Sequence, residues 1–219
     1  MADQKLALPA ELRRLIARDL QPVAPLPSPF RRALGLVPIG MVLLVAAVIV
    51  FGLRRDAGRL GLVLTWGAST IQMLLGLALV AGALREAVPG TTLPRRIAGI
   101  AFGTALIAVL AVTFTTWAVS PTIVAPGYAV TVWGICLTGT LVSALPVLAA
   151  AGWLAARAFP LRPRLAGALY GVGAGLMADA GWRLFCHFSD PVHVLGAHTL
   201  GIAVTGVLGV VSAVWARRR

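Results

Sequence analysis

The sequence predicts an all-α, polytopic membrane protein with six transmembrane helices, and three observations lead to this prediction. Of the 219 residues, 59% are hydrophobic and only 12% are charged, which is roughly half the charged share of a soluble domain. The apolar residues gather into six runs, each close to the ~20 residues that a membrane-spanning helix needs. All but one of the 19 Lys and Arg residues lie outside these runs, as they do in membrane proteins. The predicted spans are residues 34–53, 60–84, 97–117, 130–156, 165–184 and 191–214.

The basic residues also predict how the chain is oriented. Fifteen of the 19 Lys and Arg residues fall in the N-terminal segment, in the connections 85–96 and 157–164, and in the C-terminal tail. The other side of the membrane has only Arg54, Arg55, Arg59 and Arg183. The positive-inside rule therefore predicts that both termini are cytoplasmic. The net charge of +12 does not indicate direct binding of nucleic acid, because the sequence has no basic stripe with interleaved aromatic residues.

The predicted domain organisation is a cytoplasmic arm (residues 1–33), a transmembrane domain in the lipid bilayer (residues 34–214) and a basic cytoplasmic tail (residues 215–219). Within the arm, residues 9–20 predict a short amphipathic helix. Its apolar positions recur at i, i+3, i+4 and i+8, namely Leu12, Leu15, Ile16 and Leu20. Such a helix either lies on anionic lipid or docks its apolar stripe into a groove on a soluble partner. The four prolines that follow it form a stiff connector, which slightly favours docking because it holds the helix away from the bilayer.

The ligand-forming residues of the chain are concentrated in one short stretch. Residues 186–198 contain all three histidines and one of the two cysteines. The predicted topology puts this stretch at the outer face, and it puts Cys136 at the outer face as well. Outside the cytoplasm, two thiols can pair or be oxidised. The alternative for Cys136 is that it packs between helices as a small apolar residue.

The same stretch is a candidate metal site. Its possible ligands are Cys186, His187, His193 and His198. Cysteine and histidine suit zinc or copper, although no CxxC or HxxxH spacing is present. His193 and His198 are five positions apart, about 140° around an ideal helix, so an ion bound by both requires a distorted first helical turn. The alternative is that these histidines form hydrogen bonds at the membrane interface.

The fifth predicted span has a regular pattern of small and charged residues. Gly167, Gly171 and Gly175 recur every four residues, and Asp179 and Arg183 continue the same spacing. Glycines at this interval allow a neighbouring helix to approach closely, which directs Asp179 toward the protein interior. We expect an intramembrane ion pair between Asp179 and Arg183, four residues apart. A signalling or proton-relay role for Asp179 is the alternative.

Three stretches of this sequence carry a resemblance to a known family. They are LRRLIARDLQPVAPLPSPFRRAL in the arm, CLTGTLVSALPVLAAAGWLAARAFPLRPRLAGAL, and CHFSDPVHVLGAHTLGI. The chain resembles the NrsF-like family of six-span bacterial membrane anti-sigma factors. The family commonly has proline after its second cysteine, whereas this chain has His187.

The resemblance implies a regulator in the bacterial inner (cytoplasmic) membrane rather than an enzyme. Such proteins hold an extracytoplasmic-function sigma factor through the arm and keep it from RNA polymerase. The residues that would bind the sigma factor are Leu12, Leu15, Ile16, Asp19 and Leu20. A stress signal, commonly oxidant or heavy metal, acts through a cysteine pair at the outer face and releases the sigma factor. Cys136 and Cys186 match that pair.

Two other functions compete with this interpretation. A haem- or metal-binding membrane oxidoreductase would use His187, His193 or His198 as ligands, but it normally needs histidines on facing helices and the other predicted spans have none. A small transporter would use intramembrane polar residues, of which Gln72 and Asp179 stand out, and often has repeated halves. The sequence has no evident internal repeat.

Overall fold

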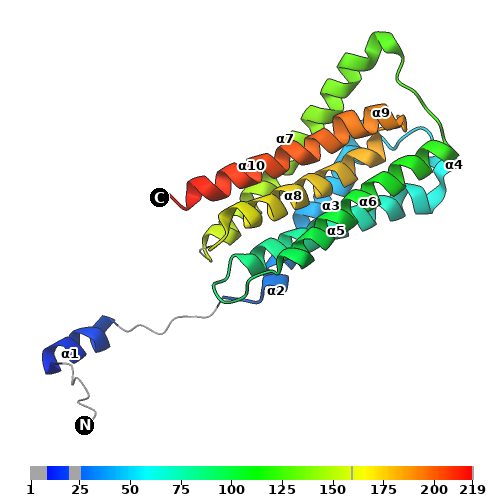
Figure 1. Ribbon diagram of the computed structural model, residues 1–219. Helices are drawn as coiled ribbons and strands as arrows, with labels where there is room; N and C mark the ends of the chain where they lie inside the picture. Colours follow the sequence, from blue (N-terminus) through cyan, green and yellow to red (C-terminus); the bar gives the residue numbers. More distant parts are fainter. Residues whose placement is uncertain (1–8, 20–25, 159, 219) are drawn as a thin grey trace.

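The computed structural model describes residues 9–19, 26–158 and 160–218, and every regular element within these ranges is a helix (Figure 1). The prediction of an all-α protein is confirmed. In chain order the helices are α1 (Ala10–Asp19), α2 (Pro29–Leu34), α3 (Val37–Phe51), α4 (Ala57–Leu62), the π-helix η1 (Val63–Gly67), α5 (Ala68–Glu86), α6 (Arg95–Val119), the 3₁₀ turn η2 (Pro126–Tyr128), α7 (Ala129–Ala156), α8 (Pro163–Phe185), α9 (Pro191–His193), the π-helix η3 (Val194–Thr199) and α10 (Leu200–Ala216).

Five helical segments of the described chain are long and apolar enough to cross a membrane, which indicates a membrane protein. They are Pro29–Phe51, Ala57–Glu86, Arg95–Val119, Pro126–Ala156 and Pro191–Ala216. Each overlaps one of the six predicted spans. The remaining predicted span, residues 165–184, coincides with α8, which is not among the five. Its glycines and its charged residues, Asp179 and Arg183, make α8 less apolar than the others.

The α8 helix lies at the centre of the bundle, where it packs against α3, α5, α7 and α10 (Figure 1). Its glycines allow these contacts, because a Cβ atom at Gly167 or Gly171 would overlap the backbone of α10. Gly173 and Gly76 bring α8 and α5 together in the same way. Close backbone approach through small residues is the usual basis of helix association in membranes. Consequently, 17 of the 23 residues of α8 are buried.

The α2 helix begins inside the segment predicted to be an extended connector. Pro29 occupies its first turn, and the side chain of Ser28 accepts a hydrogen bond from the backbone of Arg31 at 3.4 Å, both of which favour a helix start. Arg32 is buried and donates a hydrogen bond to the backbone carbonyl of Leu154 in α7. The base of the arm is therefore attached to α7.

The bundle has two ends with different contents (Figure 1). The C-terminus, α2 and the connection from α7 to α8 lie at one end, which we call the C-terminal end. The connections from α3 to α4, from α6 to α7 and from α8 to α9 lie at the other, which we call the Cys186 end.

Candidate functional site

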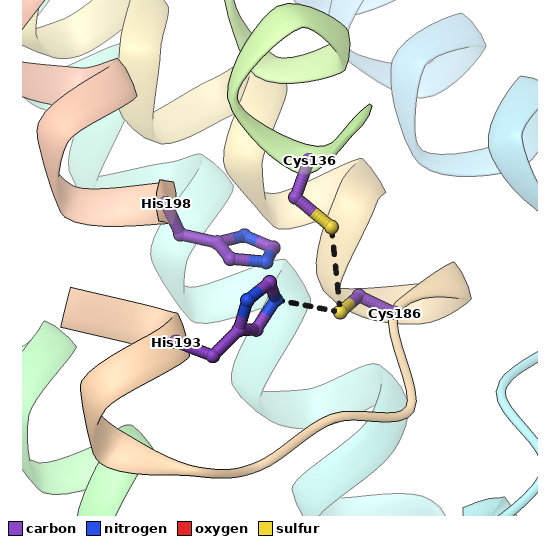
Figure 2. Close-up of side chains that lie close together, drawn as sticks. All are labelled: Cys136, Cys186, His193 and His198. Atoms are coloured by element: carbon purple, nitrogen blue, oxygen red, sulfur yellow. Dashed lines mark hydrogen bonds between the residues drawn. The ribbon is translucent and has the colours of Figure 1, made fainter. Parts of the chain in front are cut away.

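Four buried side chains meet at the Cys186 end of the bundle (Figure 2). Cys136 is the eighth residue of α7, Cys186 directly follows α8, His193 ends α9, and His198 lies in η3. We call these four residues the Cys–His cluster. One ligand atom from each lies within 4.8 Å of the others. The two Sγ atoms are 3.7 Å apart, and Cys186 Sγ is 3.4 Å from His193 Nε2.

The two histidines of the cluster meet because the helix that carries them is not a regular α-helix. Residues five apart point in different directions on an α-helix, but residues 194–199 form the π-helix η3. A π-helix hydrogen-bonds from residue i to residue i+5, which places residues with this spacing on the same side. The rings of His193 and His198 accordingly lie 5.3 Å apart, edge to face. This is the distorted first turn that the sequence required for a shared ion.

Asp179 connects the cluster to the core of the bundle. Its Oδ1 atom is 2.6 Å from His198 Nδ1. Its Oδ2 atom accepts hydrogen bonds from Arg183 Nε at 3.0 Å and from Gln72 Nε2, on α5, at 2.7 Å. Arg183 Nη2 also donates to Thr113 Oγ1, on α6, at 3.3 Å. The carboxylate is fully buried, and a buried charge requires such partners because it has lost its water.

The loop that carries Cys186 is fastened to the loop between α6 and α7. Thr122 Oγ1 donates to the carbonyl of His187 at 2.6 Å, and Thr122 N donates to Ser189 Oγ at 3.1 Å. Ser189 Oγ in turn donates to the carbonyl of Ser120. Asp190 then caps α9, accepting a hydrogen bond from the backbone of Val192 at 3.1 Å. These bonds hold the loop in one conformation beside the cluster.

A buried ion pair at the same end anchors the connection from α3 to α4 to the end of α8. Arg54 Nε donates to Asp56 Oδ1 at 2.7 Å, and the backbone N–H of Arg54 donates to the carbonyl of Leu184 at 2.8 Å. Burial alone would raise the pKa of Asp56, but the hydrogen bonds and positive charge of Arg54 outweigh it. The pKa of Asp56 therefore lies below its ordinary value.

A second ion pair, between the partly exposed Arg162 and the buried Glu86, closes the C-terminal end. Arg162 donates to both carboxylate oxygens of Glu86, at 2.6 and 2.5 Å. Leu93 joins them, because its N–H donates to Glu86 at 2.6 Å and its carbonyl accepts from Arg162 at 2.6 Å. Two connections distant in sequence are thereby joined at the start of α8.

The structure brings together three of the four predicted metal ligands and adds Cys136 to them. His187 lies outside the cluster, with its ring 4.2 Å from that of Phe188. In the arm, Leu12, Leu15 and Ile16 lie on α1 with 42%, 56% and 42% of their surface exposed. The other residues predicted for sigma-factor binding are Asp19, the last residue of α1, and Leu20, which lies outside the described residues.

Sequence reasoning missed several of these partners. Gln72 stood out as a polar residue within a span, but its contact with Asp179 joins residues 107 positions apart. Glu86 and Arg162 are 76 positions apart. A buried acid within or beside an apolar run signals that a partner exists, but nothing in the run identifies the partner.

The arrangement of the cluster permits two kinds of chemistry. Adjacent thiols can be oxidised to a disulfide, and Sγ atoms 3.7 Å apart need only a small movement to reach the ~2.05 Å of an S–S bond. Two thiols and two imidazoles can also bind a metal ion, for which tetrahedral S₂N₂ sites favour zinc.

A comparison with protein families identifies the chain. The family model described as "negative regulator of sigma F" (NrsF) matches residues 16–218, nearly the whole chain. The protein therefore belongs to this family, whose description implies a negative regulator with a sigma factor as its partner. No curated protein and no solved structure matches the chain.

Proposed function

We propose that this chain is an inner-membrane anti-sigma factor that holds an extracytoplasmic-function sigma factor through its arm and releases it when Cys136 and Cys186 react. The observation that carries the proposal is the buried cysteine pair, with Sγ atoms 3.7 Å apart, in a member of a sigma-regulator family. The role is one of binding and release rather than catalysis. The stimuli we expect at the two thiols are oxidants and heavy-metal ions.

We further propose that all six predicted spans cross the bacterial inner membrane, with both termini in the cytoplasm. The α8 helix is flanked by α3, α5, α7 and α10, so Asp179 and Arg183 are shielded from lipid and the lower apolarity of α8 is no obstacle to crossing. The distribution of arginines supports the orientation. The Cys186 end then faces outward, where oxidants arrive, and the arm faces the cytoplasm, where sigma factors are.

The exposed apolar side of α1 supports the arm as the sigma-binding element. Leu12, Leu15 and Ile16 are spaced as one helix face and are all exposed. Amphipathic helices of this kind bind by laying that face into an apolar groove of the partner. Asp19 and Leu20 complete the predicted binding set by their positions in the sequence.

The α7 helix offers a route from the thiols to the arm. Cys136 lies near one end of α7, and the carbonyl that accepts the hydrogen bond from Arg32 belongs to Leu154, near the other. These two positions are 18 residues apart, roughly 27 Å along a helix. Pro146 lies between them and lacks a backbone N–H. A shift of α7 against α8 at the thiols would therefore reach the base of the arm.

Hydrogen peroxide can serve as the oxidant that converts the two thiols to a disulfide. The two thiols lose two electrons and two protons and form one S–S bond, while hydrogen peroxide gains them and leaves as two water molecules. The sulfur atoms must approach by more than 1 Å, from 3.7 Å to about 2.05 Å, which draws the start of α7 toward the end of α8.

Affinity purification from native membranes tests this function. The wild-type chain should bring down a sigma factor, and the double substitution Leu15→Asp/Ile16→Asp should reduce its yield at least tenfold. Ala10→Asp/Ala17→Asp is the matched control, because it adds the same charge to α1 away from the apolar face and should retain the sigma factor. Peroxide should release the sigma factor from the wild type but not from Cys136→Ser. A wild-type chain that brings down no sigma factor would overturn the proposal.

A further inference from the structure

The Cys–His cluster has the dimensions of an assembled metal site. In a tetrahedral zinc site with Zn–S bonds of ~2.3 Å and Zn–N bonds of ~2.05 Å, the sulfur atoms lie about 3.8 Å apart and sulfur lies about 3.6 Å from nitrogen. The observed distances are 3.7 Å between the Sγ atoms and 3.4 Å between Cys186 Sγ and His193 Nε2. Figure 2 shows both sulfur atoms on one side and both imidazole rings on the other, and one ligand atom from each residue lies within 4.8 Å of the others.

An unpartnered nitrogen gives independent evidence of a ligand. His198 is 1% exposed and its Nδ1 atom faces Asp179 Oδ1 at 2.6 Å, but its Nε2 atom is buried with no hydrogen-bond partner. Leaving a buried polar atom unpaired costs on the order of 1–3 kcal/mol. A metal-binding histidine typically donates its second N–H to a carboxylate, which fixes the tautomer and leaves the other nitrogen free for the ion. Asp179 is placed to do this for His198.

The charges of the surroundings also suit a divalent cation. Two cysteines bind zinc as thiolates, so binding releases two protons and the two negative charges cancel the charge of the ion. Asp179 is balanced by Arg183 at 3.0 Å. The loaded site and its supporting residues then carry no net charge, which matters because an uncompensated charge is costly in a buried position.

The geometry points to a zinc site formed by Cys136, Cys186, His193 and His198 in the resting protein, with Asp179 as a positioning residue that holds His198 in the metal-binding tautomer. This ion would join the start of α7 to the end of α8, 50 positions later in the chain, and to the turn formed by α9 and η3 that follows α8. Zinc also keeps the two sulfur atoms apart as thiolates.

This inference deepens the proposed function and rests on it for one consequence. When peroxide oxidises the site, the two thiolates form a disulfide, two protons are taken up with the peroxide to give two water molecules, and one zinc ion leaves. Release of zinc and release of the sigma factor would then follow from the same reaction.

The metal content of the purified full-length chain tests the site. The wild type, purified without chelators, should contain one zinc ion per chain by elemental mass spectrometry. Cys136→Ser and His198→Gln should each lower this at least tenfold. His187→Gln is the matched control, because His187 belongs to the same loop but lies outside the cluster, and it should retain the ion. Only variants that elute and melt as folded protein are compared.

Cobalt(II) titration of the wild type needs no variant. It should give the intense visible bands of a tetrahedral cobalt ion with thiolate ligands, displaced by zinc. Asp179→Asn should keep these bands at saturation while weakening the affinity for cobalt by about 10- to 100-fold, an effect that a purely structural role would not produce. A folded wild type that lacks zinc and shows no thiolate–cobalt bands overturns the inference, as does zinc retained in both Cys136→Ser and His198→Gln.

The outcomes separate this inference from the proposed function. A wild-type chain that binds the sigma factor but contains no metal overturns the zinc site alone. A chain that holds zinc but brings down no sigma factor overturns the regulatory function and supports the site.

Discussion

The α8 and α6 helices have nearly the same length but opposite surroundings. Seventeen of the 23 residues of α8 are buried, whereas α6 buries only five of its 25. The α6 helix exposes large apolar side chains such as Ile97, Ile100 and Ile107, while α8 buries Asp179 and Arg183. Only α6 has the apolar character of a candidate span. High hydropathy in this bundle therefore marks helices that face outward, and the central helix is the most polar because its neighbours supply the partners for its polar groups.

The largest loss of stability should come from substitutions that fill the space through which α8 approaches α10. At Gly171, even a Cβ atom would overlap the backbone of Thr205 and Gly206. Gly171→Leu should therefore destabilise the bundle by about 3 kcal/mol or more, because a tightly packed contact cannot accept the added atoms. Unfolding in detergent, followed by circular dichroism, measures this change.

Gly103→Leu provides the matched control on α6, because no heavy atom lies within 4 Å of a Cβ at Gly103. It should leave the unfolding transition close to that of the wild type. Equal losses in the two variants would remove the contrast between the central and the outward-facing helix.

A smaller effect is expected at the start of α8, where Arg162 meets Glu86. Glu86→Gln removes the charge of a fully buried carboxylate but keeps an acceptor for the N–H of Leu93. The melting temperature should fall by several degrees, since Arg162 loses its ionic partner. Glu11→Gln removes the same charge from the exposed α1 helix and should have no effect. A similar melting temperature for both variants would show that the ion pair does not anchor α8.

The smallest change in stability is expected at the other end of α8, where the contribution of the Arg54–Asp56 ion pair should depend on pH. The pKa of Asp56 is lowered in the folded protein by its bonds with Arg54. The stabilisation from this pair is therefore complete above the unfolded-state pKa, roughly 3.9, and is lost as the pH falls through the lower folded-state pKa. Asp56→Asn should melt below the wild type at pH 7, and the difference should shrink as the pH falls below about 4. A difference that does not depend on pH would exclude the ion pair as its cause.

The positions of the helices could be predicted from the sequence because each apolar run begins and ends close to the ends of one helix. The segment predicted as 97–117, for example, is the helix Arg95–Val119. The start of α2 was harder to predict from the sequence. The four prolines in this segment indicated a connector, whereas Ser28 and Pro29 together begin a helix.

The candidate site was only partly predictable, because three-dimensional contacts decide it. Apolar runs and charge placed Cys136 and Cys186 at the same end of the bundle, but their distance depends on how α7 and α8 pack. His193 and His198 would lie on different faces of an ideal α-helix. The sequence of residues 194–199 does not predict the π-helix that brings the two side chains together. The role of Asp179 as the partner of His198 likewise follows from contact between α8 and η3.

The π-helix η3 is equivalent to an α-helix that has accepted one extra residue. An extra residue of this kind rotates the side chains of α9, which precedes η3, about the helix axis relative to the side chains of α10, which follows it. Deleting a single residue between 194 and 199 would allow a regular α-helix to form and would turn α9 by about 100° relative to α10. His193 would leave the cluster, while the glycine contacts between α8 and α10 would keep their alignment. The insertion or deletion of one residue at this point would therefore form or disrupt the Cys–His cluster while the packing of the other helices stays the same.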